Sequence, residues 1–189
     1  MLRESLVCAC LLVAAQYSCL AQYVPPTQAE RNTGYLKSLV DPLALVAAAA
    51  GSGISQWRDT PHEWGQGGDA YALRFVNSYG YHFVRQTMMF GASSLLHEDN
   101  RYFPCPRSGA KTRILYAIES NFLARHIDGS RHFSYSWFGA TLGTAALSRV
   151  WQPPSTRTPP NIASSFGIAV AVQVGFRVAH EFVPFMRHR

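Results

Sequence analysis

The chain has 189 residues, of which 48% are apolar and 15% are charged, and its net charge is +6. This length predicts one domain, and the charged fraction is well below the roughly one quarter that is usual for soluble domains. The basic residues form no nucleic-acid-binding motif. We therefore expect a membrane or anionic lipid as the partner and exclude nucleic acid.

The first 21 residues have the pattern of a secretory signal peptide. Arg3 gives a positive start, residues 6–15 form a short apolar core, and small residues precede a cleavage site before Gln22. The core is shorter than a membrane-spanning helix. A lipoprotein cut before Cys19 is the alternative, although Gln16 occupies the −3 position, where such a signal has an apolar residue. The sequence thus predicts an exported protein of the periplasm or of a membrane in the cell envelope.

Cys105 is the one cysteine that remains after removal of the signal peptide. An exported domain with one thiol forms no internal disulfide, so packing or lipid must stabilise it. The four ligands of a structural zinc site are missing as well, and we expect neither a metal nor a cofactor. Cys105 lies between two prolines, which favours a turn thiol. Pairing with a second chain is the alternative.

After a polar linker over residues 22–34, the sequence predicts a single helical domain over residues 35–189. Periodicity and turn signals divide it into five helices, over residues 36–57, 69–96, 111–126, 135–150 and 161–182. Pro42 is tolerated only near a helix start, so Asp41 is an alternative cap for the first helix. The segment "WQPPSTRTPP" is expected to be extended. No useful strand pattern is present, and we predict an all-α fold, a compact bundle of about five helices.

Small residues recur every fourth position in several of these helices. Residues four apart drift only about 40° around a helix, so they form a smooth groove. The fourth helix has a GxxxG pair, Gly139 and Gly143. The last helix carries a longer stripe, formed by Ala163, Gly167, Ala171, Gly175 and Ala179. Such stripes are typical of helix packing in membranes and indicate a possible homo-oligomer. Close packing in a soluble bundle is the alternative.

The longest uncharged stretches limit the membrane interpretation. They cover residues 42–57, 133–148 and 161–176, and each gives a helix of about 24 Å, against about 30 Å of hydrocarbon. Such helices span a thinned bilayer, enter it partway or lie in its interface. They are equally suited to the core of a soluble bundle.

Polar side chains line one face of the second predicted helix. Arg74, Ser78, His82 and Arg85 fall within about 80° of one another, and Arg177 lies on a polar face of the last helix. A buried arginine needs a partner, so Glu119 is expected to pair with one of the three arginines. Arg74, His82, Arg85 and Arg177 are therefore candidates for holding an anionic head group. A solvent-facing stripe on an amphipathic helix is the alternative.

The stretch "SSLLHEDNRYFPCP" follows the same helix and concentrates the chemistry-bearing residues. The candidate catalytic residues are His97, Asp99, Arg101 and Glu119. No known template fits, because Arg101 stands where an HExxH motif needs histidine and no Gly-x-Ser-x-Gly turn exists. The structural alternative is that Asp99 closes a turn and Arg101 bridges to it. The dipeptide His-Glu occurs three times, at His62, His97 and His180, and nothing in the spacing requires these pairs to form a metal site.

The segments "WGQGGDAYALRF", "SSLLHEDNRYF" and "FSYSWFGATLGTAALSRVWQPPSTR" resemble a family of small exported bacterial proteins, mostly acidobacterial. Their shared element is similar to Leu-Leu-His-Glu/Gln-Asp-Pro-Arg-Tyr-Phe, and Asn100 stands where that pattern has proline. The likeness covers most of the chain after the signal peptide. It implies export and a shared fold, and it transfers no catalytic residue.

Taken together, these patterns predict an exported cell-envelope protein, a membrane-associated helical bundle with a structural or lipid-contacting role. The alternative is an enzyme that acts at the membrane surface on a lipid or cell-wall substrate through a His/Asp/Arg site.

Overall fold

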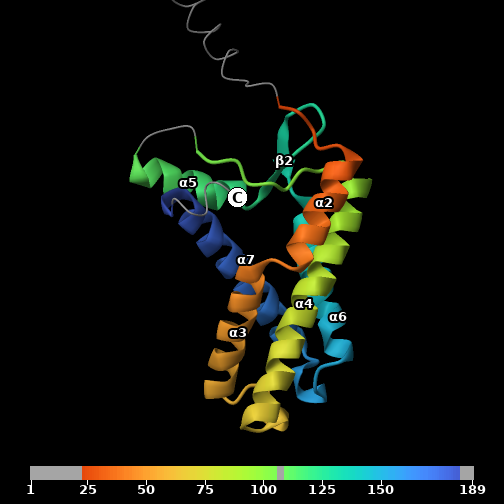
Figure 1. Ribbon diagram of the computed structural model, residues 1–189, viewed down its shortest axis with the longest axis vertical. Helices are drawn as coiled ribbons and strands as arrows, with labels where there is room; N and C mark the ends of the chain where they lie inside the picture. Colours follow the sequence, from red (N-terminus) through yellow and green to blue (C-terminus); the bar gives the residue numbers. More distant parts are fainter. Residues whose placement is uncertain (1–22, 106–108, 184–189) are drawn as a thin grey trace, which may run out of the picture.

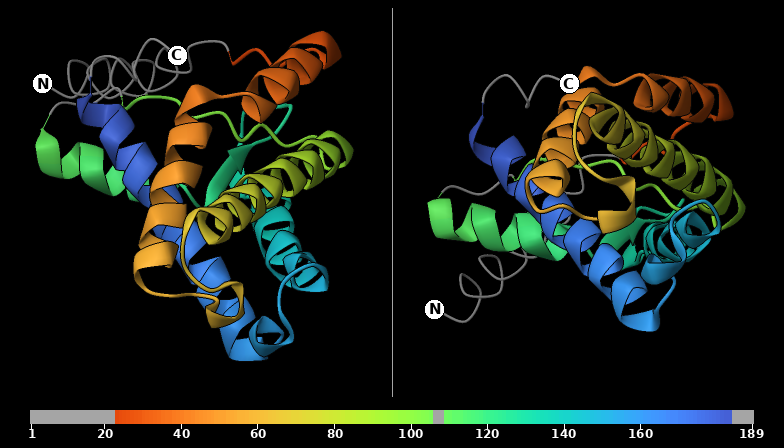
Figure 2. Two further views of the ribbon diagram at one scale, coloured as in Figure 1. Left: turned by 60° about the horizontal axis from the view of Figure 1, so that its bottom comes forward. Right: turned by 90° about the horizontal axis from the view of Figure 1, so that it is seen from below.

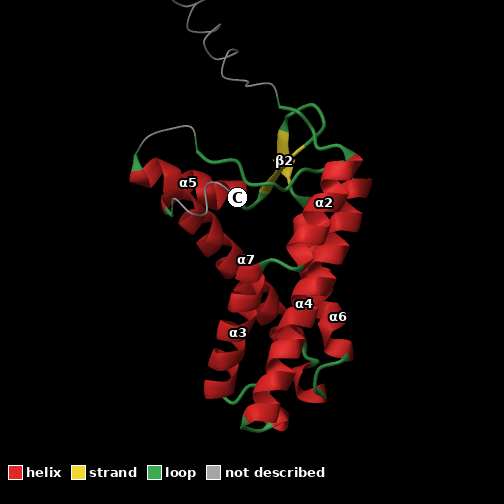
Figure 3. Ribbon diagram, viewed as in Figure 1, coloured by secondary structure: helices red, strands yellow, loops and turns green. Residues whose placement is uncertain are grey.

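The computed structural model describes residues 23–105 and 109–183 and confirms the prediction of an all-α bundle (Figure 3). The helices are α2 (Gln28–Leu39), α3 (Pro42–Trp57), α4 (Gly68–Leu95), α5 (Ala110–Ser120), α6 (Tyr135–Leu147) and α7 (Pro159–Phe182). Three short 3-10 turns lie between them, at His62–Trp64, Ser148–Val150 and Pro154–Thr156. The expected signal peptide and its cleavage site lie outside the described residues.

The start of the domain differs from the sequence prediction. The stretch expected as a linker is helical from Gln28, because Thr27 and Glu30 form a reciprocal capping box at the start of α2. The single helix expected over residues 36–57 is two helices. Asp41 accepts a hydrogen bond from the Leu43 backbone N–H and begins α3 with Pro42 in its first turn.

The helix expected over residues 111–126 is also shorter than predicted. It ends at Ser120, and β1 (Leu123–Arg125) then pairs antiparallel with β2 (Arg131–Phe133). The strand is fixed by a distant residue, since the Asp99 backbone N–H donates to the Arg125 carbonyl at 2.7 Å and the Arg125 N–H donates back at 3.0 Å. This pairing is invisible in local sequence, which explains why no strand was predicted.

Helix α4 is the centre of the bundle. Helices α2, α3 and α6 pack on it, and α7 packs on α6 and α5 (Figure 1). The α3–α4 loop and the connection from α6 to α7 lie at one end of the molecule, and α5 with the hairpin lies at the other (Figures 1 and 2). The proline-rich connection contains the 3-10 turn Pro154–Thr156, and α7 begins at Pro159, two residues before its expected start.

Burial in this bundle is inverted relative to a soluble protein. Among the described residues, the buried apolar set consists of Cys105, Trp137 and six alanines, whereas fourteen polar or charged residues are buried. Large apolar side chains lie on the outside, with Trp57 at 85%, Val76 at 67% and Ile168 at 61% exposure. Single exposed apolar residues are ordinary, but exposure of this many together with a polar interior is not.

Two helical segments are long and apolar enough to cross a membrane, Gln28–Trp57 and Pro159–Phe182. Their most apolar windows are only 11% and 6% buried. A core helix of a soluble protein passes the same test of composition, but it is mostly buried, and neither of these segments is. Helix α7 has 24 residues, which gives about 36 Å of helix.

Candidate functional site

Glu98 is the most deeply buried member of the predicted cluster and serves as a helix cap. It is 1% exposed, and its carboxylate accepts hydrogen bonds from the backbone N–H groups of Tyr135 at 3.1 Å and Ser136 at 2.9 Å. These groups begin α6, whose positive dipole end favours a carboxylate. Sequence analysis attached no role to Glu98 beyond the His-Glu dipeptide.

Asp99 closes a turn, as the structural alternative proposes. Its carboxylate accepts from the Arg101 backbone N–H at 3.0 Å, the Arg101 Nη2 at 2.8 Å and the Tyr23 hydroxyl at 2.9 Å. Burial alone would raise the pKa of Asp99, but the hydrogen bonds from Arg101 outweigh burial and lower it. Burial and the bond to Asp99 raise the pKa of Tyr23 to about 12. The carboxylate therefore stays ionised as the partner of Arg101.

The four catalytic candidates do not converge on one cleft. His97 is exposed, with a backbone φ of 55°. Glu119 has a side chain that is 62% exposed and lies 3.9 Å from Arg131. A cavity of about 280 Å³ is lined by Asp99 and Arg101 but by neither His97 nor Glu119. The structure thus gives no shared site for a His/Asp/Arg mechanism.

The third His-Glu dipeptide belongs to another structural cluster. Glu181 is 1% exposed and accepts bonds from the Tyr102 hydroxyl, the Cys105 backbone N–H at 2.8 Å and the Arg113 Nε at 2.8 Å. It therefore joins the segment after α4 to both α5 and α7. Within residues 23–105 and 109–183, no three His, Cys, Asp or Glu side chains gather in a way that could hold a metal ion.

The head-group candidates are also dispersed. All five N–H groups of Arg74 are used, with acceptors on Gln56, Asp59, Thr60, Pro61 and Gly65. The His82 Nε2 lies 2.8 Å from the Ser38 carbonyl, and Arg177 donates to the Ser120 carbonyl at 2.6 Å. Arg85 has no hydrogen bond or ion pair within the described part of the chain. The pairing expected for Glu119 with one of these arginines is wrong, because Glu119 lies against Arg131.

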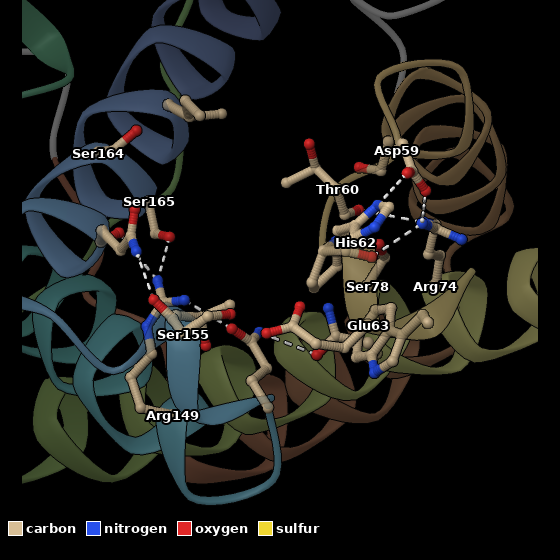
Figure 4. Close-up of a pocket in the computed structure, with 18 residues that line it drawn as sticks. Asp59, Thr60, His62, Glu63, Arg74, Ser78, Arg149, Ser155, Ser164 and Ser165 are labelled. Atoms are coloured by element: carbon tan, nitrogen blue, oxygen red, sulfur yellow. Dashed lines mark hydrogen bonds and ion pairs between the residues drawn. The ribbon is translucent and has the colours of Figure 1, made fainter. Parts of the chain in front are cut away.

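A second cavity, of about 620 Å³, lies at the end of the bundle that holds the α3–α4 loop (Figure 4). One wall is formed by that loop, with Asp59, His62 and Glu63, and the opposite wall is formed by Arg149 and the first turns of α7. Hydroxyl groups surround the space, contributed by Ser55, Thr60, Ser78, Ser155, Thr156, Ser164 and Ser165. The volume is in the range of small-molecule sites.

Arg149 holds the α7 wall of this cavity together. It is 8% exposed and donates to the Ala145 carbonyl at 3.2 Å, the Gln152 Oε1 at 2.6 Å and the Asn161 carbonyl at 2.9 Å, and also to the Ser165 hydroxyl. Four of its five N–H groups are thereby used. All these acceptors are neutral, and no carboxylate of the described residues lies within ion-pair distance.

The loop wall carries negative charge. Asp59 bonds to the His62 Nδ1 and to Gln66, and its pKa is lowered first by the bond to His62. The side chain of His62 is 89% exposed. The pKa of Glu63 is lowered, mainly by the hydroxyl of Ser155, so this carboxylate is held in its charged form.

Arg74 and Ser78 of this cavity were predicted as part of a polar stripe, and His62 was noted only for its His-Glu dipeptide. Ser148-Arg149 follows a helix whose apolar face gives no hint that the arginine turns inward. The loop acids and the α7 hydroxyls are far apart in the chain and meet only after folding. The dipeptide His62-Glu63 was the one available signal.

Comparison with known protein families, curated proteins and solved structures finds no match. The resemblance to small exported bacterial proteins therefore stays a prediction.

Proposed function

We propose that the protein is a membrane-embedded helical bundle of the cell envelope with a lipid-contacting role. The observation that carries this proposal is the inverted burial, with polar and small side chains inside and large apolar side chains outside. In water, each large apolar side chain left exposed forgoes about 1.5–3 kcal/mol of burial free energy. In a bilayer the same surface is favourable.

Helix α7 supports this proposal most directly. The two glycines of its small-residue stripe face open space, since Cβ atoms added at Gly167 and Gly175 would meet no atom within 4 Å. The stripe and the exposed Ile168 and Val172 are free to contact acyl chains or a second copy of the chain. The net charge of +6 suits a surface of anionic lipid. Export rests on the signal-peptide pattern and on the resemblance.

The first test asks whether the exposed face of α7 contacts a bilayer or water. Val172 is 49% exposed near the middle of α7, and Ile127 is 62% exposed in the turn between β1 and β2. In water, Val172→Arg would change stability by at most about 0.5 kcal/mol. In the hydrocarbon core it would cost about 2.5–3.5 kcal/mol.

We therefore expect Val172→Arg to lower the amount of protein recovered in membranes severalfold, whereas the matched variant Ile127→Arg, outside both apolar helical segments, behaves as wild type. Both variants would be expressed with the native signal, and the membranes would be washed with carbonate and urea. Release of the wild type by these washes, or equal recovery of both variants, would contradict membrane embedding.

A further inference from the structure

The large cavity carries an arginine whose charge is not balanced. Two buried arginines, Arg149 and Arg177, have no carboxylate within ion-pair distance among the described residues. Of the two, only Arg149 lines the cavity. A buried cation that bonds only to neutral groups is costly, so an incoming negative group beside Arg149 would be stabilised.

The same cavity has an acidic group beside the cationic one. Glu63 lines the same cavity as Arg149 and Ser155, both of which belong to the connection between α6 and α7 (Figure 4). Asp59 is already engaged by His62, Gln66 and Arg74. Glu63 is thus the acid that remains available, and a purely anionic ligand would be repelled by it.

We propose that this cavity binds the head group of a zwitterionic phospholipid that carries a phosphate and a primary amine. The phosphate lies beside Arg149, Ser164 and Ser165, where a guanidinium and hydroxyl groups donate to its oxygens. The ammonium lies beside Glu63, which accepts its hydrogen bonds. This inference rests on the proposed membrane embedding and names the lipid chemistry that one site selects.

The course of α7 gives the acyl chains a path out of the cavity. Ser164 and Ile168 both line the cavity, and Ile168 is 61% exposed. Val172 follows one helical turn later on the same face and is 49% exposed. A lipid whose head lies at Arg149 can therefore run its chains along an apolar surface that the protein leaves uncovered.

The test is retention of defined lipids by the full chain after purification in a mild detergent. Dioleoyl phosphatidylethanolamine, phosphatidylglycerol and phosphatidylcholine are added at equal concentration, and bound lipid is counted by native mass spectrometry. We expect phosphatidylethanolamine to be retained about tenfold better than either competitor, since a charge-assisted hydrogen bond contributes about 1.5–3 kcal/mol. Phosphatidylglycerol lacks the amine, and the choline head lacks its N–H donors.

Substitutions at Glu63 and Arg149 test which residue binds the amine and which binds the phosphate. Glu63→Gln should bring phosphatidylethanolamine and phosphatidylglycerol to within about twofold of each other, whereas Asp69→Asn, an exposed acid outside the cavity, should change nothing. Arg149→Gln should lower retention of all three lipids about tenfold, and Arg157→Gln is its matched control. Arg149 also supports the fold, so Ser164→Ala tests the phosphate end without breaking any hydrogen bond of the described structure.

Equal retention of the three lipids by a protein that stays in carbonate-washed membranes would overturn the head-group assignment and leave membrane embedding standing. Release from membranes together with loss of all lipid binding would overturn both. Soluble phosphoethanolamine is the last arm, and its binding to the detergent-solubilised protein as tightly as the phospholipid would overturn the assignment to a lipid.

Discussion

Replacement of Glu98 by alanine should be the most damaging change at the end of the bundle that holds the hairpin. The side chain is 1% exposed, and its carboxylate receives the backbone N–H groups of Tyr135 and Ser136 and the hydroxyl groups of Ser134 and Ser136. The Ser134 hydroxyl also donates to the Asn100 Oδ1 and keeps that acceptor in the variant. The Ser136 hydroxyl only accepts from the Asn100 Nδ2, so its O–H loses its acceptor, as do the two backbone N–H groups.

The magnitude follows from the donors that lose their acceptor. A buried donor without a partner costs about 1–3 kcal/mol, and the lost interaction of the carboxylate with the helix dipole adds a few tenths to about 2 kcal/mol. We expect Glu98→Ala to lower the free energy of unfolding by about 3 kcal/mol in all, because the terms overlap. Glu98→Gln retains an acceptor oxygen and should lose about half as much.

Thermal unfolding in detergent, followed by far-UV circular dichroism, measures this loss. For a chain of this size, about 3 kcal/mol corresponds to a Tm lower by roughly 6–12 °C. Glu119→Ala is the control, since that side chain is 62% exposed and should change stability by less than about 0.5 kcal/mol. A Glu98→Ala variant that melts with the wild type would refute the capping role.

Three further changes test other parts of the fold by the same melting experiment. Asp99→Ala should lose about 1–2 kcal/mol and Asp99→Asn less. Because the pKa of Asp99 is lowered in the folded state, its contribution to stability is complete above about pH 4 and is lost as the pH falls through the folded pKa. The difference in Tm between wild type and Asp99→Asn should therefore be smaller at pH 3 than at pH 7, and equal differences would contradict this role of Asp99. Gly175→Ala should stabilise the fold by up to about 1 kcal/mol. Gly143→Ala should stabilise it by less, since the added Cβ would lie 2.6 Å from the Met88 Cε. A larger gain for Gly143→Ala than for Gly175→Ala would show that another surface packs on α7 at Gly175. Arg74→Lys should lower the free energy of unfolding by about 3 kcal/mol, because an ammonium cannot replace five fixed donors. An unchanged Tm would show that the α3–α4 loop keeps its conformation without these hydrogen bonds.

The long helices could be predicted because their signals are local. Periodic apolar residues and turn signals define α4, α6 and α7 to within about three residues of the structure. The break between α2 and α3 was only partly visible. Asp41 and Pro42 indicated a helix start, but the capping box of Thr27 and Glu30 was read as a polar linker.

The site could not be predicted because its signals are not local. Whether a polar stripe faces solvent, a loop or a cavity depends on the chain that covers it. Arg74 was taken as a head-group ligand, but the α3–α4 loop and Gln56 of α3 together accept from every one of its donors. His97 and Asp99 are two residues apart in sequence, yet one is exposed and the other is 4% exposed.

The buried arginines explain how a bundle with so little apolar core holds together. Arg74 bonds to carbonyl groups of the α3–α4 loop, Arg149 to those of the connection into α7, and Arg177 to the end of α5. In a bilayer, apolar contact between helices gains little over contact with lipid, so close packing and polar bonds must supply the stability. Carbonyl groups at helix ends also need donors wherever water is excluded. An arginine at each junction meets both needs, and Arg149 is the one whose junction also borders an open cavity. The fixing of the helix ends and the selection of a lipid head group thus draw on the same side chain.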